Sequence, residues 1–568
     1  MTVKNPGFRA SLLALLCSMT PMFAAAESVE AETVSDTAPA ISIITDGKIW
    51  TGTTKSAEHL WASTLVIKGN RIEAVGNNQL ATVYLSEYPD AKIIDVDGKL
   101  VLPGFIDNHT HFMDGAESLV SVKTQGTTSK REFSSRIRNY AKGLEPGEWI
   151  TGGLWDHEAW GGELPNKRWI DRHTKNNPVF LLRTDGHMAI ANSGALKLAG
   201  ITRDTPDPLG GVIVRDKKGN PTGVLKDNAM NAVFDVQPPH SLQRARSIFD
   251  AGIAEGLRNG VTQIHNMSNW ENITLFEDAR KQGRLKLRVY YFPHISNRHK
   301  LAQRIKSQGK GDNWLRFGGV KELVDGSLGS TTAWFYDPYT DEPDTSGFPL
   351  MTMDSLQTSI EEAHAYGLQL AIHGIGDQAN DKILDLFEAL DVSGSRPRIE
   401  HAQHLSADAI KRFAALGVVP SMQPYHAIDD GRWAEKRIGE KRLQGTYAFN
   451  SLLNAGARLS FGSDWSVAPL NPISGIYAAV TRQTLDGKNP QGWIPQEKIS
   501  VTQAITAYTT NNAWAGQQEE DLGTLEPGKL ADLVVLSDNL FEIAPEEIIN
   551  AQVVLTIIDG EIAYKASR

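Results

Sequence analysis

The stretch Val101-Leu-Pro-Gly-Phe-Ile-Asp-Asn-His-Thr-His111 decides the fold class of this chain. It begins with apolar residues and ends with two histidines, which is the pattern of a buried strand with polar side chains at its end. Side chains at positions i and i+2 of a strand point to the same face. His109 and His111 can therefore reach one metal ion together. Because a single His-x-His pair is weak evidence of a metal, the prediction depends on further ligands downstream.

Further polar residues follow short apolar runs in the same way. His373, His401 and Asp464 each end such a run. In the run that contains Lys321, strand alternation puts Lys321 and Asp325 on one face. Ends of successive strands can bring these side chains together with the first two histidines. The candidate ligand set is four histidines, one aspartate and one lysine: His109, His111, Lys321, His373, His401 and Asp464.

This ligand set indicates a divalent transition metal. Imidazole and carboxylate groups suit zinc, and also manganese, iron or nickel. Lys321 is the unusual member, because an ammonium group is repelled by a metal dication. The lysine fits if carbon dioxide carbamylates it, since the resulting carboxylate can bridge two metals. The sequence leaves open whether one or two ions bind, and each residue taken alone could be an ordinary hydrogen-bonded core residue.

Short apolar strands alternate with amphipathic helices through most of the chain. Residues 405–417 illustrate the helical part: Ser406 can cap its start, Phe413 lies on its apolar face, and Gly417 can end it. This β-then-α order predicts a parallel sheet. The length of 568 residues and the number of strands fit an α/β fold of the (β/α)8 TIM-barrel type over residues 103–515.

The two ends of the chain have a different pattern. Residues 41–102 contain short alternating strands with hairpin signals at Asp46-Gly47, Lys68-Gly69-Asn70 and Asp97-Gly98. Residues 516–568 repeat this style, with a turn signal at Asp559-Gly560. Neither end has enough strands for a stable sheet alone. We therefore predict one small β-sandwich built from both ends.

The alternation of strands and helices is interrupted between about residues 132 and 235. Several tryptophans lie in this region, among them Trp155, and a hairpin pattern begins at Gly211. We interpret the region as an insertion after the first barrel strand. It would project over the carboxyl-terminal mouth of the barrel, where active sites of this architecture lie.

The first 26 residues resemble a secretory signal peptide. Lys4 and Arg9 precede a short apolar run, and Ala24-Ala25-Ala26 forms a cleavage site. We expect cleavage near Ala26, a disordered lead-in over residues 27–40, and a periplasmic or secreted protein without a stable membrane anchor. Cleavage would take the formal charge from −10 to −12 and remove Cys17, the single cysteine. An acidic surface argues against nucleic acid and against anionic membranes as partners.

Several motifs together resemble the amidohydrolase superfamily, in the branch of amidohydrolase family 3 that contains N-substituted formamide deformylase. The matching pieces are Pro-Gly-Phe-Ile-Asp-Asn-His-Thr-His, Val-Lys-Glu-Leu-Val-Asp-Gly-Ser-Leu-Gly-Ser, His-Gly-Ile-Gly-Asp-Gln-Ala, Arg-Ile-Glu-His-Ala-Gln and Phe-Gly-Ser-Asp-Trp. Near the carboxyl terminus, Gly-Lys-Leu-Ala-Asp-Leu-Val-Val-Leu resembles a sandwich strand of the same family. The resemblance extends over nearly all of the chain after residue 41.

The resemblance implies a role for each ligand. His109, His111 and Asp464 would hold one metal, while His373 and His401 would hold a second, with carbamylated Lys321 between them. Asp464 would also take a proton from the attacking water and pass it to the leaving amine. For substrate binding the candidates are His187, Trp155 and Asp325, and His187 could bind the substrate carbonyl or oxyanion. His404 is expected to be a loop residue outside the ligand set.

These expectations predict a metal-dependent hydrolase of a non-peptide C–N bond, acting on an N-substituted or N-acyl amide through a metal-bound hydroxide. A lactone, ester or cyclic-imide hydrolase is the alternative on the same site. An inactive binding protein on this scaffold is the other alternative, and missing ligands would signal it. The partner is expected to be a small-molecule substrate, and association into a homo-oligomer is left open.

Overall fold

The computed structural model describes residues 40–53, 60–392 and 394–567. The signal peptide and most of the lead-in that the sequence predicts lie outside these residues. The described residues from Ala40 onward form one compact unit. Its centre consists of parallel strands, and a helix follows each of them except β17, which β18 follows directly. The strands are β8 (Phe105–Thr110), β15 (Val261–Ser268), β16 (Arg288–Pro293), β17 (Leu315–Phe317), β18 (Gly319–Leu323), β19 (Gln369–Gly374), β20 (Arg398–His401), β21 (Val419–Met422) and β22 (Ser460–Phe461).

These strands form two sheets that together have the arrangement of a TIM barrel. One sheet has the order β17-β16-β15-β8 and the other β18-β19-β20-β21-β22, and all neighbours are parallel. The hydrogen-bond ladders do not close into a single cylinder. Isolated parallel bridges, His294 with Lys321 and Thr110 with Trp465, join the two sheets at their edges. The fold is therefore α/β and TIM-barrel-like, as the alternation of strands and helices predicts.

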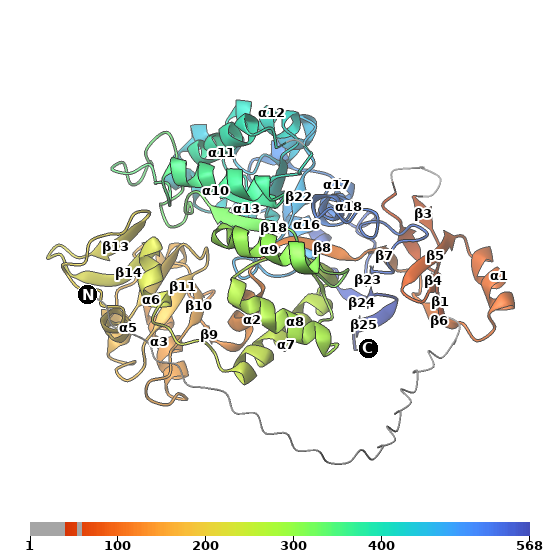
Figure 1. The fold of residues 1–568 in the computed structure, drawn as a ribbon, viewed down its shortest axis with the longest axis horizontal. Helices are drawn as coiled ribbons and strands as arrows, with labels where there is room; N and C mark the ends of the chain where they lie inside the picture. Colours follow the sequence, from red (N-terminus) through yellow and green to blue (C-terminus); the bar gives the residue numbers. More distant parts are fainter. Residues whose placement is uncertain (1–39, 54–59, 393, 568) are drawn as a thin grey trace, which may run out of the picture. The chain divides into compact units, whose positions relative to one another are not determined.

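Helices follow the strands in chain order (Figure 1). They are α2 (Phe112–Val120), α7 (Leu242–Arg258), α8 (Ile273–Lys281), α9 (Arg298–Gln308), α10 (Met353–Ala365), α11 (Asp377–Ala389), α12 (Ala407–Ala415), α13 (Pro424–Asp430), α14 (Ala434–Ile438), α15 (Phe449–Asn454), α16 (Pro472–Thr481), α17 (Val501–Tyr508) and α18 (Thr510–Ala515). None of the described helices is long and apolar enough to span a bilayer.

The helix predicted over residues 405–417 is present as α12. The Ser406 hydroxyl accepts a hydrogen bond from the Ala409 amide at 3.0 Å, which caps the helix as expected. Phe413 is fully buried on the apolar face. Gly417 follows with a φ of 64°, a left-handed conformation that ends the helix at little cost only for glycine.

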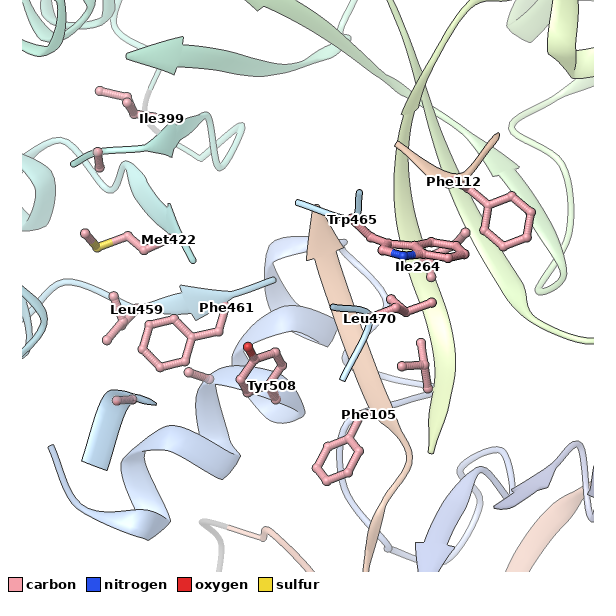
Figure 2. Close-up of a cluster of buried hydrophobic side chains, with 14 of the residues drawn as sticks. Phe105, Phe112, Ile264, Ile399, Met422, Leu459, Phe461, Trp465, Leu470 and Tyr508 are labelled. Atoms are coloured by element: carbon pink, nitrogen blue, oxygen red, sulfur yellow. The ribbon is translucent and has the colours of Figure 1, made fainter. Parts of the chain in front are cut away.

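Aromatic side chains pack around the first and last barrel strands. Figure 2 shows Phe461 beside Tyr508 and Trp465 beside Ile264. The ring centroids of Phe461 and Tyr508 are 5.6 Å apart, and those of Phe112 and Trp465 are 5.8 Å apart. Because Phe112 and Trp465 directly follow predicted ligands in the chain, their packing fixes the segments that carry those ligands.

A six-stranded sheet combines strands from both ends of the chain, in the order β25-β24-β23-β7-β2-β3. A four-stranded sheet in the order β5-β4-β1-β6 shares a hydrophobic core with it. The helix α1 (Gln79–Glu87) joins two strands of the smaller sheet. The strands are β1 (Ile41–Thr45), β2 (Lys48–Trp50), β3 (Trp61–Ala62), β4 (Thr64–Lys68), β5 (Arg71–Gly76), β6 (Lys92–Asp95), β7 (Leu100–Pro103), β23 (Leu533–Leu536), β24 (Val553–Ile558) and β25 (Glu561–Lys565).

Only some of the turn signals at the two ends belong to hairpins. The turns after Lys68 and at Asp559-Gly560 join the antiparallel pairs β4–β5 and β24–β25, as predicted. Asp46-Gly47 and Asp97-Gly98 instead lie where the chain leaves one sheet for the other, so hairpins there are wrong. Both kinds of turn need a residue with positive φ, and the φ of Asp46 is 52°. The local sequence therefore cannot distinguish them.

The insertion forms its own six-stranded sheet in the order β13-β14-β12-β11-β10-β9. It starts at Val122, about ten residues before the predicted boundary, because its first strand is too short to show a periodic pattern. The hairpin predicted from Gly211 is present. The elements are β9 (Val122–Lys123), α3 (Lys130–Ala141), β10 (Gly152–Trp155), α4 (Arg168–Asp171), β11 (Phe180–Arg183), β12 (Met188–Ala191), α5 (Ser193–Leu198), β13 (Gly211–Arg215), β14 (Pro221–Asp227) and α6 (Asn231–Phe234).

A buried ion pair connects the barrel with the carboxyl-terminal strands. Arg288, the first residue of β16, donates to both carboxylate oxygens of Asp532, at 2.7 and 2.9 Å, and to Asp559 at 2.9 Å. The side chains of Arg288 and Asp532 are almost completely buried. Removing one partner would leave the other charge buried without compensation.

We expect Arg288→Ala to lower the free energy of unfolding by about 3–5 kcal/mol, the usual cost of breaking a buried ion pair. Chemical denaturation followed by circular dichroism measures this loss. Arg284→Ala is the matched control, because its pair with Asp250 is solvent-exposed and should contribute at most about 1 kcal/mol. Equal losses in the two variants would contradict the structural role of the buried pair.

Candidate metal centre

The six residues that the sequence predicts as ligands converge at the carboxyl-terminal ends of the barrel strands. Each strand supplies a polar residue where it ends, and parallel strands end at the same edge. Five of the six are buried, and His111 is half-buried. They lie on β8 and directly after it (His109, His111), in β18 (Lys321), in β19 (His373), at the end of β20 (His401) and after β22 (Asp464).

His109, His401 and Asp464 form the most compact group. Each offers one ligand atom, and these atoms lie within 4.8 Å of one another. Asp464 Oδ1 is 3.5 Å from His109 Nε2 and 3.4 Å from His111 Nε2. Lys321 Nζ lies 3.4 Å from His109 Nε2. The His373 and His401 rings are adjacent, with centroids 4.5 Å apart.

Hydrogen bonds at the ring nitrogen Nδ1 orient two of the imidazole rings. Glu400 Oε2 accepts from His109 Nδ1 at 2.5 Å, and Gln423 Oε1 accepts from His401 Nδ1 at 2.8 Å. With Nδ1 protonated, the lone pair of each Nε2 is available to a metal. The sequence analysis missed Glu400 and Gln423. A signal for Glu400 was present, because alternation places it with Arg398 on one face of a buried strand.

Burial shifts the protonation equilibria at this site. It lowers the pKa of His109, His373 and His401, so these rings are neutral near pH 7 and able to bind a metal. Burial also raises the pKa of Asp464, and the charge of Lys321 opposes that rise. A buried carboxylate is therefore costly here unless a cation lies beside it.

The donor set fits a divalent transition metal. Asp464 Oδ1 is buried and has no hydrogen-bond partner among the described residues, which leaves it available as a ligand. All the candidate donors are nitrogen or oxygen, the ligands that zinc and related metals take from histidine and aspartate. His109, His401 and Asp464 would hold an ion, with His111, His373 and Lys321 around it.

The backbone is strained at two of the ligands. His401 has a φ of 75° and Asp464 a φ of 57°, left-handed conformations that are unfavourable for side chains other than glycine. Two backbone hydrogen bonds hold the turn at Asp464: its amide donates to the His109 carbonyl, and the Val467 amide donates to the Asp464 carbonyl. The surrounding structure thus holds these two side chains toward the other ligands.

A cavity of about 510 Å³ opens beside the ligands, a size that suits a small molecule. The barrel strands and the loops that follow them contribute one part of its lining, including His111, His373, His401 and Asp464, and the insertion contributes another part. The part from the insertion includes an apolar group of residues: Leu182, Met230 and Phe234. A smaller pocket of about 50 Å³ lies on another side of the same ligands.

The three candidate substrate residues lie in different surroundings. His187 lines both the cavity and the smaller pocket. Trp155 is buried in the core of the insertion, where its indole N–H donates to the Leu181 carbonyl, and it does not line either space. Asp325 accepts hydrogen bonds from the backbone amides around it, those of Trp334, Ile375 and Gly376, and lies 3.4 Å from His373 Nε2.

His187 and His404 have clear hydrogen-bond partners. Asp227 Oδ1 lies 2.7 Å from His187 Nδ1, and the Asp227 carboxylate raises the pKa of His187 against the effect of burial. His404 is buried with Nδ1 2.9 Å from the Thr446 hydroxyl, and it is absent from the lining of the cavity. Its placement outside the ligand group agrees with the expectation from sequence.

The fold and this cluster define a barrel protein of the metal-dependent hydrolase type. A family model described as "Amidohydrolase family" matches residues 92–564, so the chain belongs to that family. It is 36% identical to Protein LONG AFTER FAR-RED 3 of Arabidopsis thaliana, with 94% of each chain covered. It is 29% identical to N-substituted formamide deformylase of Arthrobacter pascens, with 90% of this chain and 96% of the relative covered.

Solved structures agree with this assignment. An uncharacterized metal-dependent hydrolase from Pyrococcus horikoshii is 29% identical, with a TM-score of 0.72, and the match covers 89% of this chain and 99% of that one. A second such hydrolase, from Pyrococcus furiosus, is 30% identical with a TM-score of 0.70, over 89% of this chain and all of that one. These neighbours support a metal-dependent hydrolase.

We expect the purified protein to carry roughly one to two equivalents of a divalent transition metal, because the ligands fit such an ion. Elemental analysis measures this content. A chelator should lower the thermal midpoint, since a metal that binds only the native state stabilises it.

His401→Gln should lose at least about half of that metal. His426→Gln is the control, because His426 lies near His401, with ring centroids 6.4 Å apart, but outside the ligand group. Metal-free protein that added metal does not change would show that the cluster is not a metal centre.

Proposed function

We propose that this protein is a metal-dependent hydrolase of a non-peptide amide bond, with an N-substituted or N-acyl amide as substrate. The observation that carries the proposal is the convergence of the predicted ligands at the floor of one cavity, with Asp464 among them. The similarity to an N-substituted formamide deformylase supports an amide as the substrate.

When bound, a divalent metal, which we propose to be zinc, supplies a water with a pKa of roughly 7 and polarises the scissile carbonyl. Asp464 accepts the proton of the attacking water on its carboxylate. It then donates that proton to the leaving nitrogen. A buried carboxylate whose pKa is raised by its surroundings suits both halves of this transfer.

We further propose that Lys321 is carbamylated. Lys321 is 4% exposed, and its Nζ lies 3.4 Å from His109 Nε2. Burial lowers its pKa, which favours the neutral amine that reacts with carbon dioxide. The neutral amine forms an N–C bond with carbon dioxide and releases one proton, and the anionic carbamate that results offers oxygen ligand atoms.

His187 is proposed to bind the substrate carbonyl oxygen. It comes from the insertion and lines both spaces that meet at the ligands. Its ring lies next to His373, with centroids 5.0 Å apart. Asp227 holds Nδ1, so Nε2 is the nitrogen left to contact substrate. The insertion would then supply substrate contacts while the barrel supplies the ligands.

The alternative reaction is hydrolysis of a lactone, ester or cyclic imide, because the same activated water can attack any of these carbonyls. A screen of metal-loaded protein against formamides, N-acyl amino acids, dipeptides and lactones separates the possibilities. We expect kcat/KM for an N-substituted or N-acyl amide to exceed that for a lactone by at least about tenfold, or about 1.4 kcal/mol. Turnover of lactones alone would favour the alternative, and no turnover at all would favour a binding protein.

Asp464→Asn tests the proton transfer. Asparagine keeps the size and one oxygen ligand but cannot accept a proton, so we expect a rate loss of at least about a hundredfold with metal content reduced by no more than about half. Ser466→Ala is the matched control, because Ser466 lines the same cavity two residues along the chain. Near-normal turnover by Asp464→Asn would contradict the role.

Lys321→Ala tests the carbamate. We expect loss of part of the metal and most of the activity, with partial recovery of both when propionate supplies the missing carboxylate. Metal analysis and rate measurements with and without propionate provide the readout. A variant with unchanged metal content and rate would show that Lys321 only fills space at the barrel mouth.

A further inference from the structure

A second hollow, separate from the catalytic cavity, lies on the surface of the insertion. It has a volume of about 400 Å³ and is lined from α3 and from the region of α4. We refer to it as the basic groove, defined by its lining: Lys130, Arg131, Ser134, Ser135, Arg138, Arg168, Trp169, Arg172 and His173. It shares no lining residue with the catalytic cavity.

The charge of the groove is opposite to that of the whole chain. Its lining contains five arginine or lysine side chains and no carboxylate, whereas the chain has a formal charge of −10. A local cluster of one sign creates a field that the net charge does not reveal. The acidic balance that argues against polyanionic partners for the whole molecule therefore does not apply here.

Few of these cations are neutralised by a neighbour. Lys130 pairs with Glu163, and Arg168 lies 3.9 Å from Asp216. Among the described residues, Arg131, Arg138 and Arg172 have no carboxylate within ion-pair distance. Arg172 instead donates to the ring of His173 at 2.8 Å. The groove thus keeps a positive charge that a ligand could balance.

The groove also offers hydroxyl groups beside its cations. Ser134 is 9% exposed, lines the groove, and makes no hydrogen bond with any other described residue. Its Oγ is reached by solvent and is not among the buried polar atoms that lack a partner. An acceptor bound in the groove could take hydrogen bonds from Ser134 and from the neighbouring Ser135.

We propose that the basic groove binds an anionic phosphate or sulfate group, either as a soluble ester or as part of a lipid headgroup. Arginine presents planar pairs of N–H donors that match phosphate and sulfate oxygens, and hydroxyl groups complete such sites. The volume suits a small molecule or a single headgroup rather than an extended polymer. The inference goes beyond the hydrolase activity and does not depend on it.

The first test measures binding of inorganic pyrophosphate to the full-length protein by calorimetry at low salt. We expect saturable binding that weakens as ionic strength rises, because salt screens exposed charges. Arg131→Gln combined with Arg138→Gln should weaken binding at least about tenfold, since two charge-assisted contacts are lost. Ser134→Ala should weaken it by a smaller factor.

The matched control changes the same number of charges elsewhere. Lys281 and Lys411 are exposed lysines on α8 and α12, outside the groove. Lys281→Gln combined with Lys411→Gln should leave binding within about twofold of the unaltered protein if the site is local. Equal weakening in both double variants, or the absence of saturable binding, would overturn the proposal. Pyrophosphate held only at the metal centre would also overturn it, since the Arg131 and Arg138 substitutions would then have no effect.

A second experiment distinguishes a lipid headgroup from a soluble ester as the source of the bound phosphate or sulfate group. Vesicles of phosphatidylglycerol are compared with vesicles of phosphatidylcholine in a sedimentation assay. Binding to the anionic vesicles alone, lost in the Arg131→Gln and Arg138→Gln double variant, assigns the groove to a lipid headgroup. Binding of pyrophosphate with no vesicle binding assigns it to a soluble phosphate or sulfate ester. Retention of hydrolytic activity in the double variant would confirm that the two sites are separate.

Discussion

The ion pair between Arg398 and Glu400 in the barrel interior is the constraint on which the site depends. Arg398 Nε lies 2.7 Å from Glu400 Oε1, and both side chains are completely buried. The guanidinium also contacts the Asn108 carbonyl, the Ser421 hydroxyl and His265, and so connects β20 with three other strands. Glu400 in turn holds His109. Burying these charges is tolerable because almost every one has a partner, and the result is a fixed ring orientation at the metal centre.

The barrel and the insertion contribute different kinds of residue to the lining of the cavity. The barrel strands supply the nitrogen and oxygen ligands, which must be held rigidly, and the packing of Phe112 against Trp465 secures the two segments nearest to them. The insertion supplies another part of the wall, including His187 and an apolar surface. Loops carried on a rigid barrel can vary while the residues at the strand ends stay fixed, and the insertion holds such a position beside the cavity.

The sequence singled out the candidate ligands because their pattern is local. An apolar run that ends in histidine or aspartate can be recognised without knowing its neighbours, and so could the helix that begins after Ser406. The supporting residues were harder to find. Glu400 and Gln423 each orient a histidine ring on another strand, and the Arg288 pair with Asp532 joins residues that are 244 positions apart. No local pattern records such contacts.

The sequence by itself determined the barrel class, the joint origin of one sheet from both chain ends, and the set of candidate ligands. These follow from periodicity and residue chemistry, which are properties of short segments. Only the tertiary structure decided which turns join hairpins, where the insertion begins, that Trp155 is a core residue, and that Ser134 and five cations share one groove. Each of these depends on which distant segments pack together, and that choice is made by the free energy of the whole fold rather than by any single stretch of chain.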